Sequence, residues 1–156
     1  MNNHYLPSKA VIERITEESA DTKTFTLSTK EKLRYKPGQF LMLSLPGYGE
    51  APFTFASCPR KDGRFEISVR KVGSLTVALH KLKEKDIVGA RGPYGNWFPL
   101  DKMKKKDFLF IAGGCGIAPL RSLIQYVLKN RKDYGKIEII YGCRAPKDIF
   151  YKDEIM

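Results

Sequence analysis

Residues 108–119 read FLFIAGGCGIAP and carry the clearest structural signal in the chain. Five consecutive apolar residues, 108–112, form a run of the kind that lies buried on both faces of a sheet. The glycine-rich turn at residues 113–116 follows, and Pro119 suits the first turn of a helix, where no backbone donor is lost. The sequence therefore predicts a strand, a tight turn and a helix in direct succession.

The helix after this turn carries an apolar stripe, and a second buried strand is expected at residues 137–141. Together they form a strand–helix–strand unit whose two strands are parallel. One such unit is too small for a stable domain, because a parallel sheet needs more strands and helices on both faces. Residues 103–156 are therefore expected to be an incomplete α/β domain, with residues 148–156 beginning a further helix. The stripe consists of Leu120, Leu123, Ile124, Val127 and Leu128.

Before the basic linker at residues 101–106, the chain shows short segments of alternating character separated by turn residues. This pattern is typical of a small antiparallel barrel or sandwich. One segment departs from it, because apolar residues recur at helical spacing over residues 75–82. Residues 1–102 are therefore predicted to form a β-barrel domain with a single short helix. The expected strands are residues 11–15, 24–27, 40–45, 53–57, 65–69 and 87–90.

The composition is that of a globular protein with a strong basic excess. The 28 Lys and Arg outnumber the 17 Asp and Glu, which gives a formal charge of +11. This charge attracts nucleotide phosphates, acidic redox proteins or nucleic acid, and does not choose among them. No apolar run is long enough to cross a bilayer, and the first ten residues lack the apolar core of a signal peptide. A cytoplasmic protein is therefore expected.

The three cysteines, Cys58, Cys115 and Cys143, are odd in number and widely spaced. This spacing argues against a disulfide framework and against a zinc or iron–sulfur site built from local pairs. The cysteines are expected to be small buried or half-buried thiols, and no metal site is predicted in these residues.

Two glycine-containing turns are candidate sites for phosphate groups. The turn at residues 113–116 allows close backbone approach, and the helix after it presents free N–H groups. Its spacing lacks the dinucleotide fingerprint, and close packing of helix on strand is the alternative reason for its glycines. Residues 73–76 repeat the arrangement, with Arg70 and Lys71 supplying positive charge. An ordinary helix cap is the alternative there.

Pro52, Phe53 and Thr54 follow a glycine-containing loop and begin a predicted strand. Phe53 is suited to offer an aromatic face to a planar ring, with the hydroxyl of Thr54 beside it. A plain core position is the alternative role for Phe53.

Taken in order, these motifs resemble those of the ferredoxin–NADP reductase superfamily. More narrowly, they are similar to the gamma subunits of cytoplasmic hydrogenases (sulfhydrogenases) and to the electron-transfer subunits of anaerobic sulfite reductase and dihydroorotate dehydrogenase. The resemblance covers nearly the whole chain, and several ordered motifs are far more specific than any one of them. The landmarks are PGQF at 37–40, APFT at 51–54, GSLT at 73–76, GPYG at 92–95, GGCGIAP at 113–119 and YGCR at 141–144.

The resemblance implies a six-stranded antiparallel barrel that holds FAD, followed by the first part of a parallel α/β domain that binds NAD(P). It implies that Phe53 lies against the flavin ring and that Thr54 tunes the flavin near its reactive nitrogen, with no acid–base side chain required. The other FAD contacts it implies are Ala51, Pro52, Ser68, Val69, Arg70, Gly73, Ser74, Leu75 and Thr76. The nicotinamide nucleotide contacts it implies are Gly113, Gly114, Gly116, Ile117, Pro119, Gly142 and Arg144.

Two departures from the family pattern matter. Many members carry Arg at the position of Ala51, where it neutralises the FAD diphosphate. The hydrogenase-type subunits are similar to this sequence in having Ala, and Arg70 is the candidate substitute. Members also continue through the rest of the nucleotide domain and often end in a cysteine cluster. A [2Fe–2S] cluster is therefore expected only in a longer C-terminal region or in a partner.

The implied function is electron transfer between NAD(P)H and an iron–sulfur partner of the hydrogenase or sulfite reductase type, in either direction. Two alternatives stay open. One is a fragment that binds FAD without full nicotinamide turnover, and the other is a basic β-barrel that holds single-stranded nucleic acid on exposed aromatics. The choice between NADH and NADPH also stays open, because Arg144 alone does not decide it.

Overall fold

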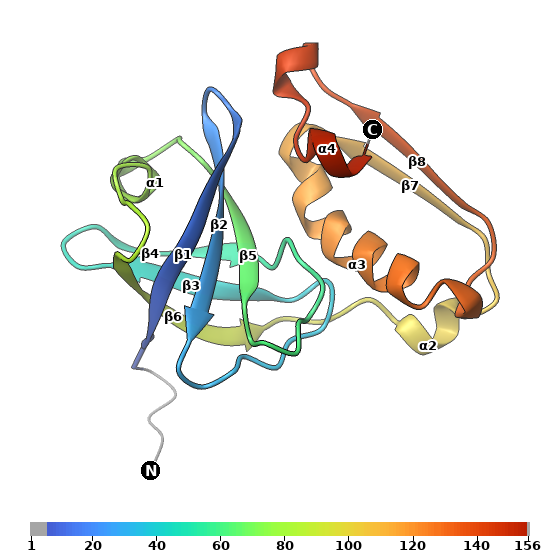
Figure 1. Ribbon diagram of the computed structural model, residues 1–156, viewed down its shortest axis with the longest axis horizontal. Coiled ribbons are helices and arrows are strands. Elements are labelled where there is room, and N and C mark those ends of the chain that lie inside the picture. Colours follow the sequence, from blue (N-terminus) through green and yellow to red (C-terminus); the bar gives the residue numbers. More distant parts are fainter. Residues whose placement is uncertain (1–5, 156) are drawn as a thin grey trace.

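The structure, a computed structural model, describes residues 6–155 and consists of a β-barrel with a smaller α/β unit beside it (Figure 1). The barrel is a six-stranded antiparallel sheet with the order β4-β3-β6-β1-β2-β5. The predicted six-stranded antiparallel fold is therefore confirmed. Its strands are β1 (Ser8–Ser19), β2 (Thr22–Thr29), β3 (Phe40–Leu45), β4 (Gly49–Thr54), β5 (Phe65–Arg70) and β6 (Ile87–Tyr94).

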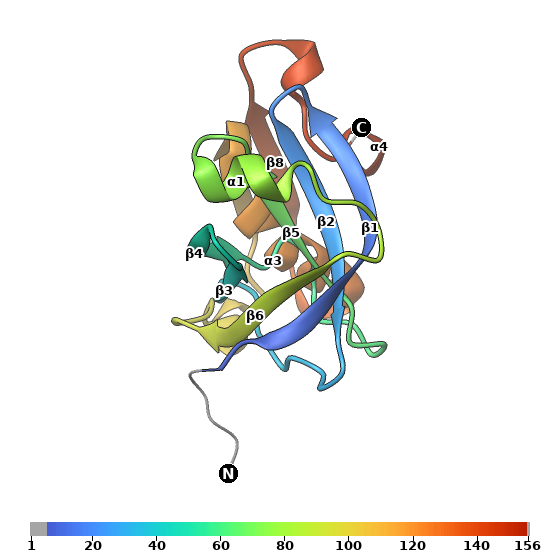
Figure 2. The ribbon, with the colours of Figure 1, turned by 90° about the vertical axis from the view of Figure 1, so that its left-hand side faces the viewer.

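The barrel core forms because alternate residues of each strand point inward. On β5, Phe65, Ile67 and Val69 are fully buried, whereas the residues between them face outward. The ring of Phe55 stacks on Tyr35 with centroids 3.7 Å apart and meets Phe65 edge-on at 5.5 Å. The predicted short helix α1 (Ser74–Leu79) lies across one end of the barrel and adds apolar side chains to this core (Figure 2).

The α/β unit consists of a short helix, α2 (Leu100–Met103), two strands, β7 (Phe108–Gly113) and β8 (Ile137–Gly142), and the helix α3 (Ile117–Lys129) between the strands. The strands are parallel and pair from Phe108 opposite Ile137 to Gly113 opposite Gly142. This confirms the predicted strand–helix–strand unit. Helix α3 lies between the two-stranded sheet and the barrel (Figure 1). The C-terminal helix α4 (Lys152–Ile155) is a single turn.

One face of the β7–β8 sheet packs against α3, and the other face is open to solvent. Leu109 is 54% exposed, Ile111 is 67% exposed and Ile140 is 56% exposed on that open face. A parallel sheet normally has helices on both faces, which fits the apolar residues that these strands carry on both sides. Within residues 6–155, no helix has both the length and the apolar character needed to span a bilayer.

Several predicted boundaries are wrong. The strand expected at residues 53–57 is β4, which ends at Thr54, and beyond it the Ser57 carbonyl accepts a hydrogen bond from Ser122 of α3. The strand expected at residues 87–90 is β6, which continues to Tyr94. Leu128 is 53% exposed, so the apolar stripe of α3 is narrower than expected. The helix expected over residues 148–156 is shortened to α4 by a 3₁₀ turn at Pro146–Asp148.

Candidate functional site

A cleft of about 490 Å³ separates the carboxyl ends of β7 and β8 from the tip of the β1–β2 hairpin. This edge of a parallel sheet is where α/β proteins usually bind their ligands. We call this space the interdomain cleft. It is lined by Ser19, Asp21 and Arg70 from the barrel and by Gly113, Gly114, Cys115, Gly142, Cys143, Arg144, Asp148 and Phe150 from the α/β unit.

Glycines keep one side of the interdomain cleft open. A Cβ atom added at Gly113, Gly114 or Gly142 would meet no other atom within 4 Å. Gly114 adopts a φ of +49°, a left-handed conformation that side chains disfavour. Helix α3 begins directly after this turn, with no acidic residue in its first turn. The turn can therefore bring its backbone N–H groups close to a phosphate.

Two arginines face the interdomain cleft, and each is paired with a carboxylate. The Nε atom of Arg70 lies 2.9 Å from Oδ2 of Asp21, and Nε of Arg144 lies 3.5 Å from Oδ2 of Asp148. The hydrogen bond from Thr22, followed by those from Arg70 and Ser19, lowers the pKa of Asp21. Arg70, the candidate substitute for the missing diphosphate-binding arginine, is therefore already partly neutralised by Asp21.

The end of β4 holds Phe53 and Thr54 outside the interdomain cleft. Phe53 is half-buried against the barrel core and pairs with Leu41 of β3. Among residues 6–155, the Thr54 hydroxyl has no hydrogen-bond partner in the protein, while Pro52 beside it is exposed and Ala51 half-buried. This leaves an accessible aromatic surface next to a hydroxyl group, the combination expected of a site for a planar ring.

The start of α1 is capped by the side chain of Thr76. The Oγ1 atom of Thr76 accepts hydrogen bonds from the N–H groups of Val72 at 2.9 Å and Gly73 at 2.8 Å. A Cβ atom at Gly73 would meet nothing within 4 Å. Gly73 and Ser74 are exposed, and Thr76 caps the start of the helix, which is the arrangement of the ordinary cap named as the alternative for this motif.

Other predicted contacts point away from both openings. The side chains of Val69 and Leu75 are buried in the barrel core, so only their backbone atoms can reach a ligand. Ser68 shares hydrogen bonds with Thr24 at 2.8 Å and with Tyr151, which turns its side chain toward the C-terminal segment. Ile117 is fully buried under the glycine turn, and Gly116 and Pro119 lie outside the cleft lining.

The cleft also contains residues that sequence reasoning missed. Asp21 reaches it because Thr22 pairs with Arg70 in the β2–β5 register, and no local pattern reveals that register. Cys115 and Cys143 line the cleft as well, and their positions beside predicted glycines are a signal that was available in the sequence.

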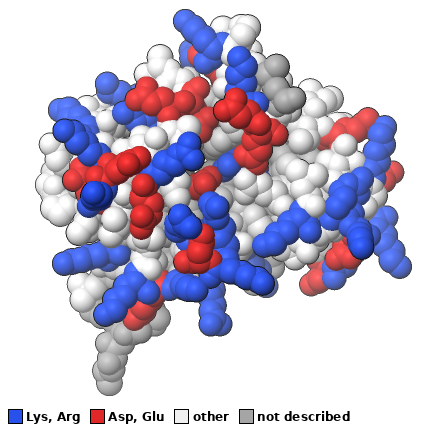
Figure 3. Space-filling model, viewed as in Figure 1, with Lys and Arg blue, Asp and Glu red and all other residues white. Residues whose placement is uncertain are grey.

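The arrangement of aromatics and charges does not favour a nucleic-acid platform. Phe55 and Phe65 are fully buried, so neither can stack on a base. On the face shown in Figure 3, acidic side chains lie among the basic ones, and the basic excess forms no continuous stripe there.

Comparison with protein families assigns both parts of the chain. A family profile described as oxidoreductase FAD-binding domain matches residues 9–98. A second profile, described as oxidoreductase NAD-binding domain, matches residues 110–156.

Curated relatives share substantial sequence identity. Sulfhydrogenase 1 subunit gamma of Pyrococcus furiosus is 48% identical over 124 residues, which cover 79% of this chain and 42% of the relative. A probable dihydroorotate dehydrogenase B (NAD(+)) electron transfer subunit of Methanocaldococcus jannaschii is 40% identical over 144 residues, covering 91% of this chain and 50% of the relative. The chain spans about half the length of the curated relatives it matches.

Solved structures share the fold. Ferredoxin–NADP+ reductase from Plasmodium falciparum superposes with a TM-score of 0.83 at 19% identity, covering 96% of this chain and 63% of that chain. Phthalate dioxygenase reductase superposes with a TM-score of 0.80 at 21% identity, covering 94% of this chain and 47% of that chain. At these identities the likeness shows the fold alone.

Proposed function

This chain belongs to the family of oxidoreductase FAD-binding domains, and from that membership we propose that it moves electrons between NAD(P)H and an iron–sulfur redox partner. We assign residues 1–102 to the FAD-binding barrel and residues 103–156 to the N-terminal part of an NAD(P)-binding domain. The matched ranges, 9–98 and 110–156, support this division. A flavin held by the barrel residues would supply the chemistry, hydride acceptance from NAD(P)H and one-electron release to the partner.

The interdomain cleft is the observation that carries the proposal. Its glycine turns leave open space above Gly113, Gly114 and Gly142, and α3 starts directly behind the first turn. A nucleotide diphosphate suits such a site, because backbone N–H groups and the positive end of the helix dipole favour an anion. Arg144 is 77% exposed at its rim and is available for a further charged contact.

The barrel offers separate groups for the ring and for the diphosphate of FAD. We assign the aromatic face of Phe53 to the flavin ring and the hydroxyl of Thr54 to a hydrogen bond with it, because that hydroxyl has no protein partner in the described part of the chain. The open helix start at Gly73, Ser74 and Thr76 suits the FAD diphosphate. Val69 and Leu75 contribute backbone only, since their side chains belong to the core.

The names of the relatives support the electron-transfer role. One is an electron transfer subunit of a dihydroorotate dehydrogenase, and another is a subunit of a sulfhydrogenase. Phthalate dioxygenase reductase, which shares the fold, is described as transferring electrons from pyridine nucleotides to [2Fe–2S]. We therefore propose a partner subunit of the hydrogenase or dihydroorotate dehydrogenase type. We also propose a cytoplasmic location, which the three free cysteines support.

An absorption spectrum of the purified chain with added FAD tests the proposal. We expect a bound-flavin spectrum that bleaches when NADH or NADPH is added anaerobically, and the faster of the two nucleotides identifies the preferred donor. Bound flavin that neither nucleotide bleaches would indicate an FAD-binding module without nicotinamide turnover. Failure to bind FAD would contradict the proposal at its base.

A further inference from the structure

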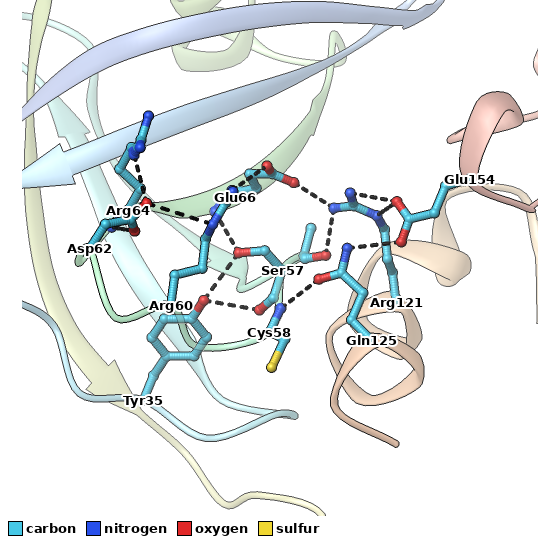
Figure 4. A network of polar contacts seen from close by, with 11 residues as sticks. Tyr35, Ser57, Cys58, Arg60, Asp62, Arg64, Glu66, Arg121, Gln125 and Glu154 are labelled. Carbon is cyan, nitrogen blue, oxygen red and sulfur yellow. Dashed lines mark hydrogen bonds and ion pairs between the residues drawn. The ribbon is translucent and has the colours of Figure 1, made fainter. Parts of the chain in front are cut away.

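One largely buried arginine joins three segments that are far apart in the sequence. Arg121 projects from α3, and its Nη1 atom donates to the carbonyl oxygen of Ala56 at 2.9 Å and to Oε2 of Glu66 at 2.6 Å (Figure 4). Its Nε atom donates to Oε2 of Glu154 at 2.6 Å. The guanidinium also lies 4.3 Å from the ring centroid of Tyr151. Only 13% of the Arg121 side chain is exposed.

The neighbouring residues of α3 complete this contact. The Ser122 hydroxyl donates to the Ser57 carbonyl at 2.8 Å, and the Cys58 N–H donates to Oε1 of Gln125 at 2.8 Å. With Arg121 on Ala56, α3 holds one backbone group of each residue in segment 56–58. All three residues of that segment are buried.

The two segments joined in this way each lead directly to a proposed cofactor site. Segment 56–58 follows Phe53 and Thr54, the residues assigned to the flavin ring. Helix α3 follows the glycine turn assigned to the nicotinamide nucleotide, and Arg121 lies five residues after Gly116, a rise of about 7.5 Å along the helix. Because a helix moves as a rigid unit, its docking at Arg121 fixes the position of the turn.

The chemistry of the cluster favours geometric precision. Burial opposes the charge of Arg121, but the hydrogen bonds and charges of Glu66 and Glu154 outweigh it and raise the pKa of the arginine. A planar guanidinium directs its donors at fixed angles, which a lysine ammonium does not do. The Ala56 carbonyl and the Glu66 carboxylate accept from the guanidinium on the barrel side and set the distance and angle at which α3 meets the barrel, while Glu154 of α4 holds the guanidinium from within the α/β unit.

We propose that Arg121 is a positioning residue that holds the nicotinamide-binding turn at the distance from the flavin strand that hydride transfer requires. The inference rests on the proposed function. It assigns Arg121 no contact with either cofactor, so its loss should slow hydride transfer without weakening the binding of FAD or NAD(P)H.

The first readout is the rate of anaerobic flavin bleaching in the FAD-loaded chain at increasing NADH or NADPH concentrations. In R121M the limiting rate should fall by about 10- to 100-fold, as expected for a displacement of about 1 Å. The apparent Kd for the nucleotide and the affinity for FAD should stay within about twofold. R121K should lie between R121M and the wild type. R34M is the matched control, because Arg34 is an exposed barrel arginine without a hydrogen bond among residues 6–155.

The second readout reports the docking of α3 without any turnover. Cys58 is 8% exposed beneath Gln125, whereas Cys115 is exposed. Alkylation of the FAD-loaded chain followed by peptide mass spectrometry gives the rate at Cys58 relative to Cys115 as an internal reference. We expect this ratio to rise at least about tenfold in R121M, because Cys58 becomes accessible when α3 is no longer held against the barrel. The ratio should stay unchanged in R34M.

The outcomes are distinguishable. If NAD(P)H bleaches the wild type and R121M equally fast, the inference is overturned and the proposed function stands. The inference is also overturned, and the proposed function still stands, if R121M is slower only because it has lost FAD. An unchanged rate of Cys58 labelling in R121M overturns the inference in the same way. If neither nucleotide bleaches the wild type, the proposed function fails and the inference falls with it. If R121M does not fold, the same two readouts are applied to R121K. This variant keeps the positive charge and loses the planar guanidinium.

Discussion

Gly113 and Gly142 lie directly opposite each other as the last pair of the parallel ladder that joins β7 to β8. Both strands leave the sheet at this level, so the turns after them open onto the same interdomain cleft. Each glycine has open space where a side chain would project. The two glycines form the surface of the cleft against which we place the nicotinamide nucleotide.

A side chain introduced at Gly142 should block nucleotide binding without unfolding the chain. Gly142 has no left-handed backbone conformation and a Cβ atom there meets nothing within 4 Å, so the stability of G142V should stay within about 1 kcal/mol of the wild type. The apparent affinity for NAD(P)H in flavin bleaching should fall at least about tenfold, or about 1.4 kcal/mol. FAD binding by the same variant is the internal control. An unchanged nucleotide affinity would place the nucleotide elsewhere.

Removing the hydroxyl of Thr54 should affect the flavin and not the fold. Within residues 6–155 this hydroxyl bonds no protein group, so T54A should keep its stability. Loss of one preorganised hydrogen bond to the reacting ring should slow bleaching by about tenfold or more and shift the reduction potential of the flavin. Stopped-flow absorbance and redox titration measure these effects. T26A, on the outer face of β2, is the control, and equal rates in T54A and T26A would remove Thr54 from the mechanism.

Asp21, which accepts hydrogen bonds from Thr22 and Arg70, should make stability depend on acid pH. The pKa of Asp21 is lowered from its ordinary value of 3.8, so its contribution is present above that value and is lost as the pH falls through the lower folded-state pKa. At pH 7, D21N should be less stable than the wild type by about 1 kcal/mol or less, because the pair is partly exposed. Denaturant unfolding should show the difference closing below pH 3.8. A difference that stays constant down to pH 2 would contradict the lowered pKa of Asp21.

Tyr35 should stabilise the segment between β4 and β5 through its hydroxyl. That group donates to the Ser57 carbonyl at 2.9 Å and lies 3.1 Å from the Ser57 hydroxyl in the buried interior. Y35F keeps the ring stack on Phe55 and removes these bonds, so the free energy of unfolding should fall by about 1–2 kcal/mol. Y48F is the control, because Tyr48 is half exposed. Equal stability of the two variants would exclude this contribution.

The sequence predicted the elements whose pattern is local. The alternation of Phe65, Ile67 and Val69 marks β5, and the apolar run at residues 108–112 marks β7. The ordered motifs also indicated the family, and the resemblance to sulfhydrogenase gamma subunits and dihydroorotate dehydrogenase electron-transfer subunits is confirmed. These signals are strong because each is contained in a few consecutive residues.

Features that depend on pairing between distant segments were missed. β4 ends at Thr54, and the segment after it bonds α3 through Ser57 and Ser122, a contact that spans 65 residues. In the sequence, Arg121 looks like an ordinary surface residue of a helix, because its carboxylate partners lie 55 and 33 residues away. The roles assigned to Phe53, Thr54 and the glycine turns stay predictions, and the experiments above test them.

Helix α3 has two buried sides. Ile124 and Val127 pack into the core of the α/β unit, while Arg121 and Ser122 bond the barrel, and Ala56 of the barrel chain lies in the α/β core itself. The two cores therefore both pack against α3, and unfolding of either core would expose one buried side of this helix. The thermodynamic consequence is cooperativity: the barrel and the α/β unit should melt together, as a single heat-absorption peak whose calorimetric and van't Hoff enthalpies agree.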